Sequence, residues 1–353
     1  MNAVWLEIGT AMARIWRVMG NCLSLCCLAL LTGQLVAGEL DPAAVRAAAT
    51  YSADRKGLSM LVIQHGKTLL EEYPGGGSAR GGRKIYSGTK AFWNLAALAA
   101  AEEGILRLDE RVAETVPAWR DDARKSHVTI RQLLDFSCGL DPGFFLHADD
   151  PGNRDTIALS LPHVAEPATA FIYGPSSLQV FHEVLKVKLK DESPTHYLER
   201  RVLRRLGLGS QRYLHDRAGN PLLASGWALS ARQWSKLGEL VLHGGSPVVS
   251  SGSLAQCWRG SSANRAFSLG WWNNRAAPGG REFDFENMLI PKWPQQNWSG
   301  ACLCSEAPSD LVACIGSLCQ RLYVIPSMDL VVVRHGGGGQ FSDGRFLRLL
   351  LGK

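Results

Sequence analysis

The stretch that most constrains this fold is the alanine-rich segment 83–104, RKIYSGTKAFWNLAALAAAEEG. Apolar residues such as Phe92 and Leu95 recur at helical spacing, alanine fills most other positions, and Gly104 is typical of a helix end. A helix of this composition must be buried. Because an unpaired ammonium is costly to desolvate, Lys90 is either exposed on the first turn or present for chemistry.

The whole chain has the composition of an ordinary globular protein. Its 353 residues are 46% hydrophobic and 20% charged, enough for one large domain or two modest ones. The formal charge of +6 is spread along the sequence in short groups. Nucleic-acid binding is therefore not expected, because a phosphate-binding surface needs clustered cations.

The first 38 residues have the pattern of a secretory signal peptide. Arg14 and Arg17 precede an apolar run that carries no charge until Glu39 and ends in small residues. This pattern predicts a signal peptide over 1–38, cleaved after Gly38, and an exported protein that is periplasmic or extracellular with no stable membrane span after cleavage. The alternative is an uncleaved N-terminal membrane anchor, because the run approaches the length of a span.

Six cysteines follow the predicted signal: Cys138, Cys257, Cys302, Cys304, Cys314 and Cys319. An even number in an exported protein permits disulfides, whose connectivity the sequence leaves open. The spacings fit a zinc site badly. We therefore expect no metal and no organic cofactor.

Periodicity along the mature chain predicts strands at both ends and helices between them. Residues 59–72 form two strand-like runs around Gly66, roughly 105–225 are mainly helical, 227–245 form an amphipathic helix, and 319–339 contain two β-branched runs. The fold class expected is α/β (α+β), with an antiparallel sheet built from N- and C-terminal segments, flanked by helices, and an inserted all-helical lobe.

Ser87 and Lys90 lie three residues apart at the start of the apolar helix, so their side chains share one face. A serine hydroxyl becomes a nucleophile when a nearby base takes its proton, and burial can lower a lysine pKa enough for that task. The backbone N–H of Ser87 at a helix start can also point at a developing oxyanion. The plain alternative is that Ser87 caps the helix.

The wider context of this motif resembles a known family. YSGTKAFWNLAALAAAEEGILRLDERVAETVPAW, followed by VTIRQLLDFSCGL, is similar to the serine β-lactamase and penicillin-binding-protein superfamily, in its class C-like esterase and 6-aminohexanoate-dimer-hydrolase branch. The resemblance implies a single β-lactamase/transpeptidase-like domain over 39–353. It also implies that Ser87 is acylated and that Lys90 assists proton transfer.

The segment EPATAFIYGPSS resembles a second family element, Tyr-x-Asn, at Tyr173. Pro175 occupies the position of the asparagine. The resemblance implies that Tyr173 shares the proton of the nucleophile, and we expect a nearby cation to make its phenolate a usable base. Ser176 or Ser177 could offer a hydroxyl to the substrate in place of the asparagine amide. The alternative for Tyr173 is a half-buried tyrosine bonded to backbone.

The third family element, a Lys-Thr-Gly-like triplet, corresponds by its position to Cys314-Ile315-Gly316, which has no cation. Cys314 and Gly316 are candidate substrate-binding residues, and the Ser317 N–H is the second expected oxyanion donor. His335, in RHGGGG, is a further candidate, with a place in a glycine-rich turn as the alternative.

Together these residues predict an exported serine hydrolase that cleaves ester or amide bonds of a small or peptide-like substrate. Without the asparagine and the cation, efficient β-lactam hydrolysis is not expected. The alternative is a non-catalytic β-lactamase-like protein that binds a cell-wall fragment or a protein partner. Trp271, Trp272 and Trp293 are expected either to line an apolar acyl pocket or to belong to the core. The oligomeric state is left open.

Overall fold

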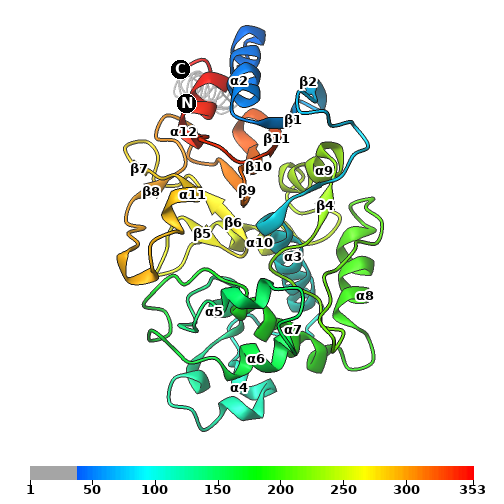
Figure 1. Cartoon of the computed structure of the whole chain (residues 1–353), viewed down its shortest axis with the longest axis vertical. Coiled ribbons are helices and arrows are strands. Elements are labelled where there is room, and N and C mark those ends of the chain that lie inside the picture. The colour runs from blue at the N-terminus through cyan, green and yellow to red at the C-terminus, as the bar shows by residue number, and fades with distance from the viewer. Residues whose placement is uncertain (1–37) are drawn as a thin grey trace, which may run out of the picture. The chain divides into compact units, whose positions relative to one another are not determined.

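Strands from the two ends of the chain pair in one seven-stranded antiparallel sheet (Figure 1). The computed structural model describes residues 38–353, of which 39–353 form one compact unit. The strand order is β2-β1-β11-β10-β9-β6-β5. Their bounds are β1 Gly57–Gln64, β2 Lys67–Glu72, β5 Phe267–Ser268, β6 Trp271–Asn273, β9 Val312–Gly316, β10 Gln320–Ile325 and β11 Leu330–Gly336. The expected sheet of N- and C-terminal segments is confirmed.

Two short strand pairs lie outside the large sheet. β3 (Arg83–Lys84) pairs antiparallel with β4 (Ala228–Leu229), and β7 (Arg281–Glu282) pairs parallel with β8 (Ala301–Cys302). The first pair ties the segment just before Ser87 to a segment about 140 residues later, so it bears directly on the site.

Helices cover both faces of the sheet. α2 (Pro42–Asp54) and α12 (Asp343–Leu350) pack together on one face, where the Tyr323 ring stacks on Phe346 of α12. α9 (Ala231–Leu242) packs on the other face, against β10 and β11. Gly238 of α9 lies so close to the sheet that a Cβ there would meet Val331 at 2.6 Å. The result is a helix–sheet–helix arrangement with an apolar centre.

Residues 105–225 form the helical lobe in the lower part of Figure 1. Apart from isolated bridges, their regular structure is α4 Val112–Thr115, α5 Ile130–Leu134, α6 Arg154–Ser160, α7 Ser176–Leu189 and α8 Pro194–Leu198, with short 3-10 and π segments. Thr129 caps α5, its Oγ1 accepting from the Gln132 N–H at 3.2 Å. Two more short helices, α10 Ser251–Leu254 and α11 Phe285–Met288, lie later in the chain.

The alanine-rich segment becomes α3 (Thr89–Glu102), and every residue from Thr89 to Ala100 is buried. Its small side chains permit close packing on all sides. At Gly270, between β5 and β6, the backbone has φ +83° and a Cβ would lie 3.0 Å from the Ala91 Cα. Gly104 ends the segment with φ +70°, a conformation that glycine adopts without strain.

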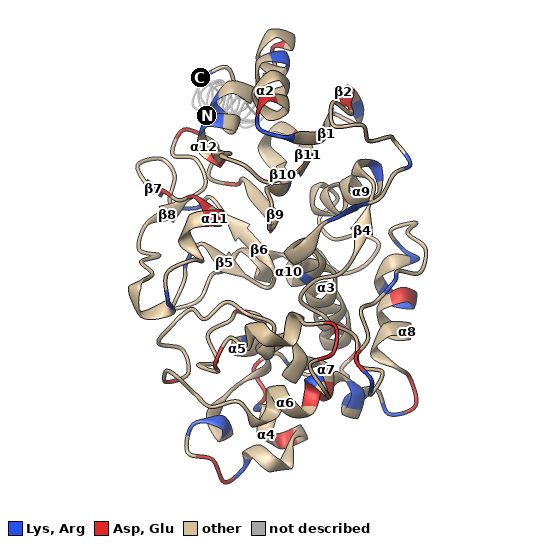
Figure 2. Cartoon of the chain, in the orientation of Figure 1, with Lys and Arg blue, Asp and Glu red and all other residues tan. Residues whose placement is uncertain are grey.

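Charged residues of both signs alternate around the outer helices and loops, whereas the central strands carry few (Figure 2). Within residues 38–353 no helix is both long and apolar enough to cross a membrane. The predicted signal peptide lies outside the described residues, apart from its last residue, Gly38.

The six cysteines of residues 38–353 are all buried and free. The disulfides that an even number permits are therefore not formed in this structure. Two of the thiols contact backbone carbonyls instead: Cys314 Sγ lies against the Gly88 carbonyl and Cys319 Sγ against the Gly339 carbonyl.

Candidate active site

A strained turn presents Ser87 at the start of α3. Ser87 lies in the 3-10 turn Tyr86–Gly88, directly after β3. Tyr86 has φ +46°, a left-handed conformation that costs energy for a residue with a large side chain. Two hydrogen bonds hold the turn: the Thr89 Oγ1 donates to the Tyr86 carbonyl at 2.8 Å, and the Ile85 N–H donates to the Trp227 carbonyl at 2.9 Å.

Lys90 is buried beside the serine. Its Nζ lies 2.8 Å from Ser87 Oγ and 2.8 Å from the carbonyl oxygen of Ala224, and the residue is only 2% exposed. In the described part of the chain no carboxylate lies within 4.0 Å of this amine. Burial lowers the pKa of Lys90 to about 7. A large fraction of the amine is therefore neutral near neutral pH and able to accept a proton.

Tyr173 completes a cluster with Ser87 and Lys90. The Lys90 Nζ lies 4.7 Å from the centroid of the Tyr173 ring. The centroids of the Tyr173 and Phe136 rings are 4.8 Å apart. Burial raises the pKa of Tyr173 well above its usual value, and the nearby Ser87 hydroxyl offsets part of that rise. The phenol is therefore neutral. The direction of this pKa shift runs against our expectation that the cation would make Tyr173 a phenolate base, which stays a prediction.

Strand β9 packs against the turn that carries Ser87. Gly316 packs so tightly on the turn that a Cβ there would lie 2.0 Å from the Ile85 carbonyl oxygen. Ser317 follows at the end of β9, so its backbone lies next to the nucleophile segment. The Cys314 thiol donates to the Gly88 carbonyl at 3.4 Å, and burial raises the pKa of Cys314 to about 12. Cys314 therefore contributes no charge.

The two serines expected to replace the missing asparagine have partners within the protein. Ser176 is 1% exposed, and its hydroxyl donates to the Asp141 carbonyl at 2.6 Å. Ser177 is 2% exposed and lies 3.2 Å from the Cys138 thiol. The substrate-binding role expected of Ser176 is corrected accordingly: its hydroxyl holds the Asp141 loop against α7.

His335 belongs to the sheet interior. It lies on β11, two strands from β9, and its Nδ1 is 2.7 Å from Ser59 Oγ. Its ring stacks on Trp234, which also lies against Gly88. Trp234 therefore occupies the space between the histidine and the nucleophile turn, and the expected contact of His335 with substrate is corrected. Burial lowers the pKa of His335 to about 4, so its ring is neutral.

A hollow of about 470 Å³ opens beside Tyr173. Trp293 lines this hollow and does not belong to the core. Whether it contacts an acyl group, as one of our two interpretations expected, stays a prediction. Trp271 and Trp272 are at most 1% exposed, and the Trp272 ring packs among Phe267, Phe283 and Trp298. These two tryptophans belong to the core.

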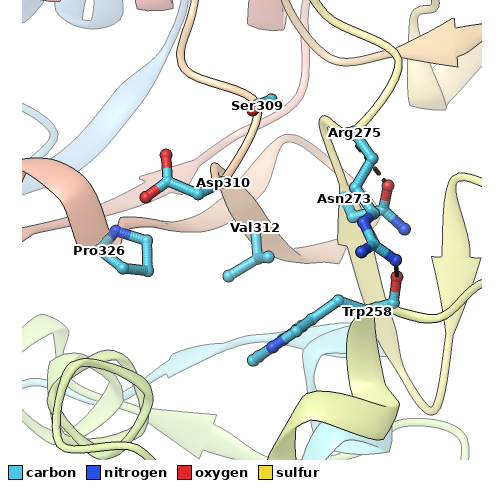
Figure 3. Close-up of a pocket in the computed structure, with 7 residues that line it drawn as sticks. All are labelled: Trp258, Asn273, Arg275, Ser309, Asp310, Val312 and Pro326. Carbon is cyan, nitrogen blue, oxygen red and sulfur yellow. Dashed lines mark hydrogen bonds between the residues drawn. The ribbon is translucent and has the colours of Figure 1, made fainter.

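A second hollow, of about 340 Å³, lies at the opposite end of β9 from Ser317 (Figure 3). Its two charged side chains have partners within the protein. The Arg275 guanidinium donates to the Trp258 carbonyl at 3.0 Å, and the Asp310 carboxylate accepts from the Ser327 N–H and hydroxyl. Within residues 38–353, no group of three or more His, Cys, Asp or Glu side chains is arranged to hold a metal ion.

Several solved structures share this architecture. A Bacillus anthracis structure titled as a 6-aminohexanoate-dimer hydrolase has TM-score 0.65 and 15% identity, with 84% of this chain and 78% of that chain covered. A family VIII carboxylesterase has TM-score 0.62 and 17% identity, with 89% and 97% covered. The Rhodobacter sphaeroides class C β-lactamase has TM-score 0.61 and 18% identity, with 87% and 97% covered. At these identities the likeness shows the fold.

The sequence itself identifies the family. The Beta-lactamase family model matches residues 41–280, more than half of the chain, so the protein belongs to this family of hydrolases. The match includes Ser87, Lys90 and Tyr173 and ends before β9. No curated protein sequence matches the chain significantly.

Sequence reasoning missed two parts of the site. The first is the Ala224 carbonyl, which accepts a hydrogen bond from Lys90. Ala224 lies in a loop shortly before β4, the partner of β3, and nothing else in the sequence connects it to the site. Leu289 and Ile290, which line the hollow beside Tyr173, belong to a segment without clear periodicity. The adjacent apolar residues Leu289 and Ile290, followed by Pro291 and Lys292, were the available signal.

Proposed function

We propose that this protein is a serine hydrolase that cleaves ester or amide bonds through an acyl-enzyme intermediate on Ser87. The observation that carries the proposal is the 2.8 Å approach of Lys90 Nζ to Ser87 Oγ, with an amine that is buried and has no carboxylate partner in the described chain. A structural lysine needs a counter-ion in such a place, whereas a general base needs to lose its proton there.

Acylation follows from the positions of three side chains. The neutral Lys90 amine takes the Ser87 proton as Oγ attacks the substrate carbonyl carbon. The backbone N–H groups of Ser87 and Ser317 donate to the oxyanion, each such donor being worth about 3–4 kcal/mol of barrier. As the intermediate collapses, the neutral Tyr173 phenol protonates the leaving oxygen or nitrogen and recovers a proton from Lys90.

Deacylation reverses these roles. Lys90 takes a proton from water, the hydroxide attacks the acyl carbon, and Ser87 leaves with a returned proton. The net reaction consumes one water and releases an acid and an alcohol or amine.

Esters and neutral amides are the proposed substrates, in preference to β-lactams. Pro175 has no side-chain amide, and the Cys314 thiol is neutral, so neither provides the polar contacts expected for a carboxylated amide. A carboxylesterase and a class C β-lactamase both have a similar fold, so the preference rests on these two residues. We also propose that the protein is exported, on the basis of residues 1–38.

The test is labelling with a fluorophosphonate, followed by intact-mass analysis, on the wild-type protein and on the Ser87→Ala variant. Ser160→Ala is the matched control, because Ser160 is exposed and its hydroxyl donates to the nearby Ile157 carbonyl. We expect one adduct on the wild type and on Ser160→Ala, none on Ser87→Ala, and turnover of p-nitrophenyl butyrate that exceeds turnover of nitrocefin.

Two results would contradict the proposal in different ways. Nitrocefin turnover comparable to ester turnover would refute the substrate preference while leaving the nucleophile intact. A folded wild-type protein without adduct or turnover would refute the enzyme and favour the binding protein, which the replaced asparagine and lysine positions suggest.

A further inference from the structure

The hollow beside Tyr173 has an apolar wall contributed by two distant chain segments. Pro142 and Phe144 come from the helical lobe, whereas Leu289, Ile290 and Trp293 come from the segment after α11. Its volume of about 470 Å³ falls within the range of small-molecule sites. The wall is therefore a built concavity that needs both parts of the fold.

The polar residues along this wall have partners in their own loops or face solvent. The Asp141 carboxylate accepts from the Gly143 N–H at 2.9 Å, and the Gln296 side-chain amide donates to the Pro291 carbonyl at 2.9 Å. Lys292 is exposed. An occupant of the hollow thus meets mainly hydrocarbon.

The rim carries large apolar side chains that are unusually exposed. Ile290 is 77% exposed and Phe144 is 58% exposed, and both line the hollow. Phe145, beside Phe144, is 54% exposed. Single exposed apolar residues are ordinary, but a group at the mouth of an apolar hollow is typical of a ligand site.

The position of the hollow decides which part of a substrate it faces. Of the three proposed catalytic side chains, Tyr173 lines it, and Ser87 and Lys90 do not. No residue of β9 lines it either. Since Tyr173 is the group that protonates the leaving atom, a pocket on its side of the centre faces the leaving group, while the acyl group stays on Ser87.

We infer that this pocket binds an apolar leaving group, so that the preferred substrates are esters or amides of hydrophobic alcohols or amines. The inference rests on the proposed function. The reaction is unchanged: the Ser87 Oγ–acyl bond forms, the acyl–oxygen or acyl–nitrogen bond breaks, and the leaving atom receives the proton through Tyr173.

The experiment compares two ester series in a pH-stat: acetates of alcohols from ethanol to hexanol, and ethyl esters of acids from acetic to hexanoic. We expect kcat/KM to rise about fourfold for each methylene in the alcohol series, as expected for burying one methylene, and to change much less in the acid series. A rise confined to the acid series, or two flat series, would overturn the inference.

Variants at the rim test the pocket itself. Ile290→Glu should reduce the ratio of hexyl to ethyl acetate turnover at least tenfold, and Ile290→Leu should retain it. Val187→Glu, at a 49% exposed apolar position on α7 that is not part of the pocket, is the control and should behave as the wild type. Equal ratios for the two glutamate variants would contradict the inference.

Binding of 1-hexanol to the Ser87→Ala protein separates this inference from the proposed function, because it needs no catalysis. Calorimetry should detect hexanol binding to Ser87→Ala and its loss in the Ser87→Ala/Ile290→Glu protein, whereas sodium hexanoate should bind more weakly. If the wild type is neither labelled nor active, the proposed function fails, and hexanol binding still decides whether the apolar site exists. Absence of hexanol binding would refute the site.

Discussion

Two buried cations in this protein have opposite surroundings. Arg321, on β10, is 0% exposed, and its Nε donates to Asp343 Oδ1 at 2.6 Å, with the Asp343 carboxylate equally buried. Burial alone would lower the pKa of Arg321, but the charge of Asp343 outweighs it, so the pKa is raised above its usual value. Lys90 is nearly as buried, but its partners are a hydroxyl and a carbonyl, and burial lowers its pKa to about 7.

The difference teaches how one fold can use buried charge for two purposes. Beside Asp343 the charge is retained, and removing that carboxylate leaves a buried ion with only part of its compensation. Beside Ser87 burial favours loss of the charge, and in the proposed mechanism the neutral amine is the base. A neighbouring carboxylate therefore distinguishes a buried cation that stabilises the fold from one that is proposed to act as a base.

The largest expected effect comes from replacing Lys90. Lys90→Met removes the proposed base while keeping the side-chain length, and we expect ester turnover to fall by about 10²–10⁴-fold, the usual contribution of a general base. Stability should not fall below that of the wild type at neutral pH. The pKa of Lys90 is lowered on folding, so wild-type stability rises with pH from about 7 to the unfolded value, and any excess stability of the variant should shrink over that interval.

Measurements of kcat/KM and of thermal unfolding at pH 7 and pH 9 check this prediction. A variant that keeps most of its turnover would show that Lys90 is structural.

The second largest effect is expected from disrupting the Arg321–Asp343 ion pair. Asp343→Asn removes the closer, fully buried partner of Arg321 and leaves the Glu286 carboxylate, 3.4 Å from its Nη1, as a weaker one. We expect a loss of about 3–5 kcal/mol in the free energy of unfolding. Denaturant titration measures this loss. Asp310→Asn is the control, because Asp310 bonds to Ser327 at an exposed position and should cost at most about 1 kcal/mol. Similar losses in both variants would remove the distinction.

The third effect concerns the pH profile. If neutral Lys90 is the base, kcat/KM should rise tenfold per pH unit below a midpoint of about 7 and level off above it. The pKa of Tyr173 is raised by burial, so no fall from its ionisation should occur below pH 10. Initial rates with p-nitrophenyl butyrate from pH 5 to 9 provide the measurement. A midpoint near the usual lysine value would contradict the assignment.

The smallest effect is expected at Cys314. The thiol is neutral and makes one contact with the Gly88 carbonyl, so Cys314→Ser should change activity and stability by no more than about 1 kcal/mol. The midpoint of the pH profile should stay unchanged. A shifted midpoint, measured as above, would show that Cys314 ionises beside Lys90 after all.

Local patterns predicted much of this architecture and the meeting of the principal side chains. The hairpin around Gly66, the buried α3 helix and the final two strands follow from periodicity and turn residues, which act over short distances. Ser87 and Lys90 share a helix face at their spacing, and their contact was therefore predictable.

What could not be predicted depends on contacts between distant segments. The Ala224 carbonyl at Lys90 results from the pairing of β3 with β4, and the hydroxyl of Ser176 is engaged because the Asp141 loop returns to it. The role of His335 likewise depends on Ser59, which is 276 positions away. A pattern in one segment carries no information about which carbonyl another segment will present.

The pairing of β1 with β11 places formation of the site late in folding. The nucleophile at 87 and the strand at 312–316 that borders it meet only after long stretches of chain have been brought together, which is a slow, high-contact-order process. A partly folded chain can hold a formed α3 helix and a capped α5 helix and still lack a site around Ser87. The covalently labelled fraction of a refolding sample should therefore equal the fraction of fully folded molecules. Its increase with time should follow the last step of folding.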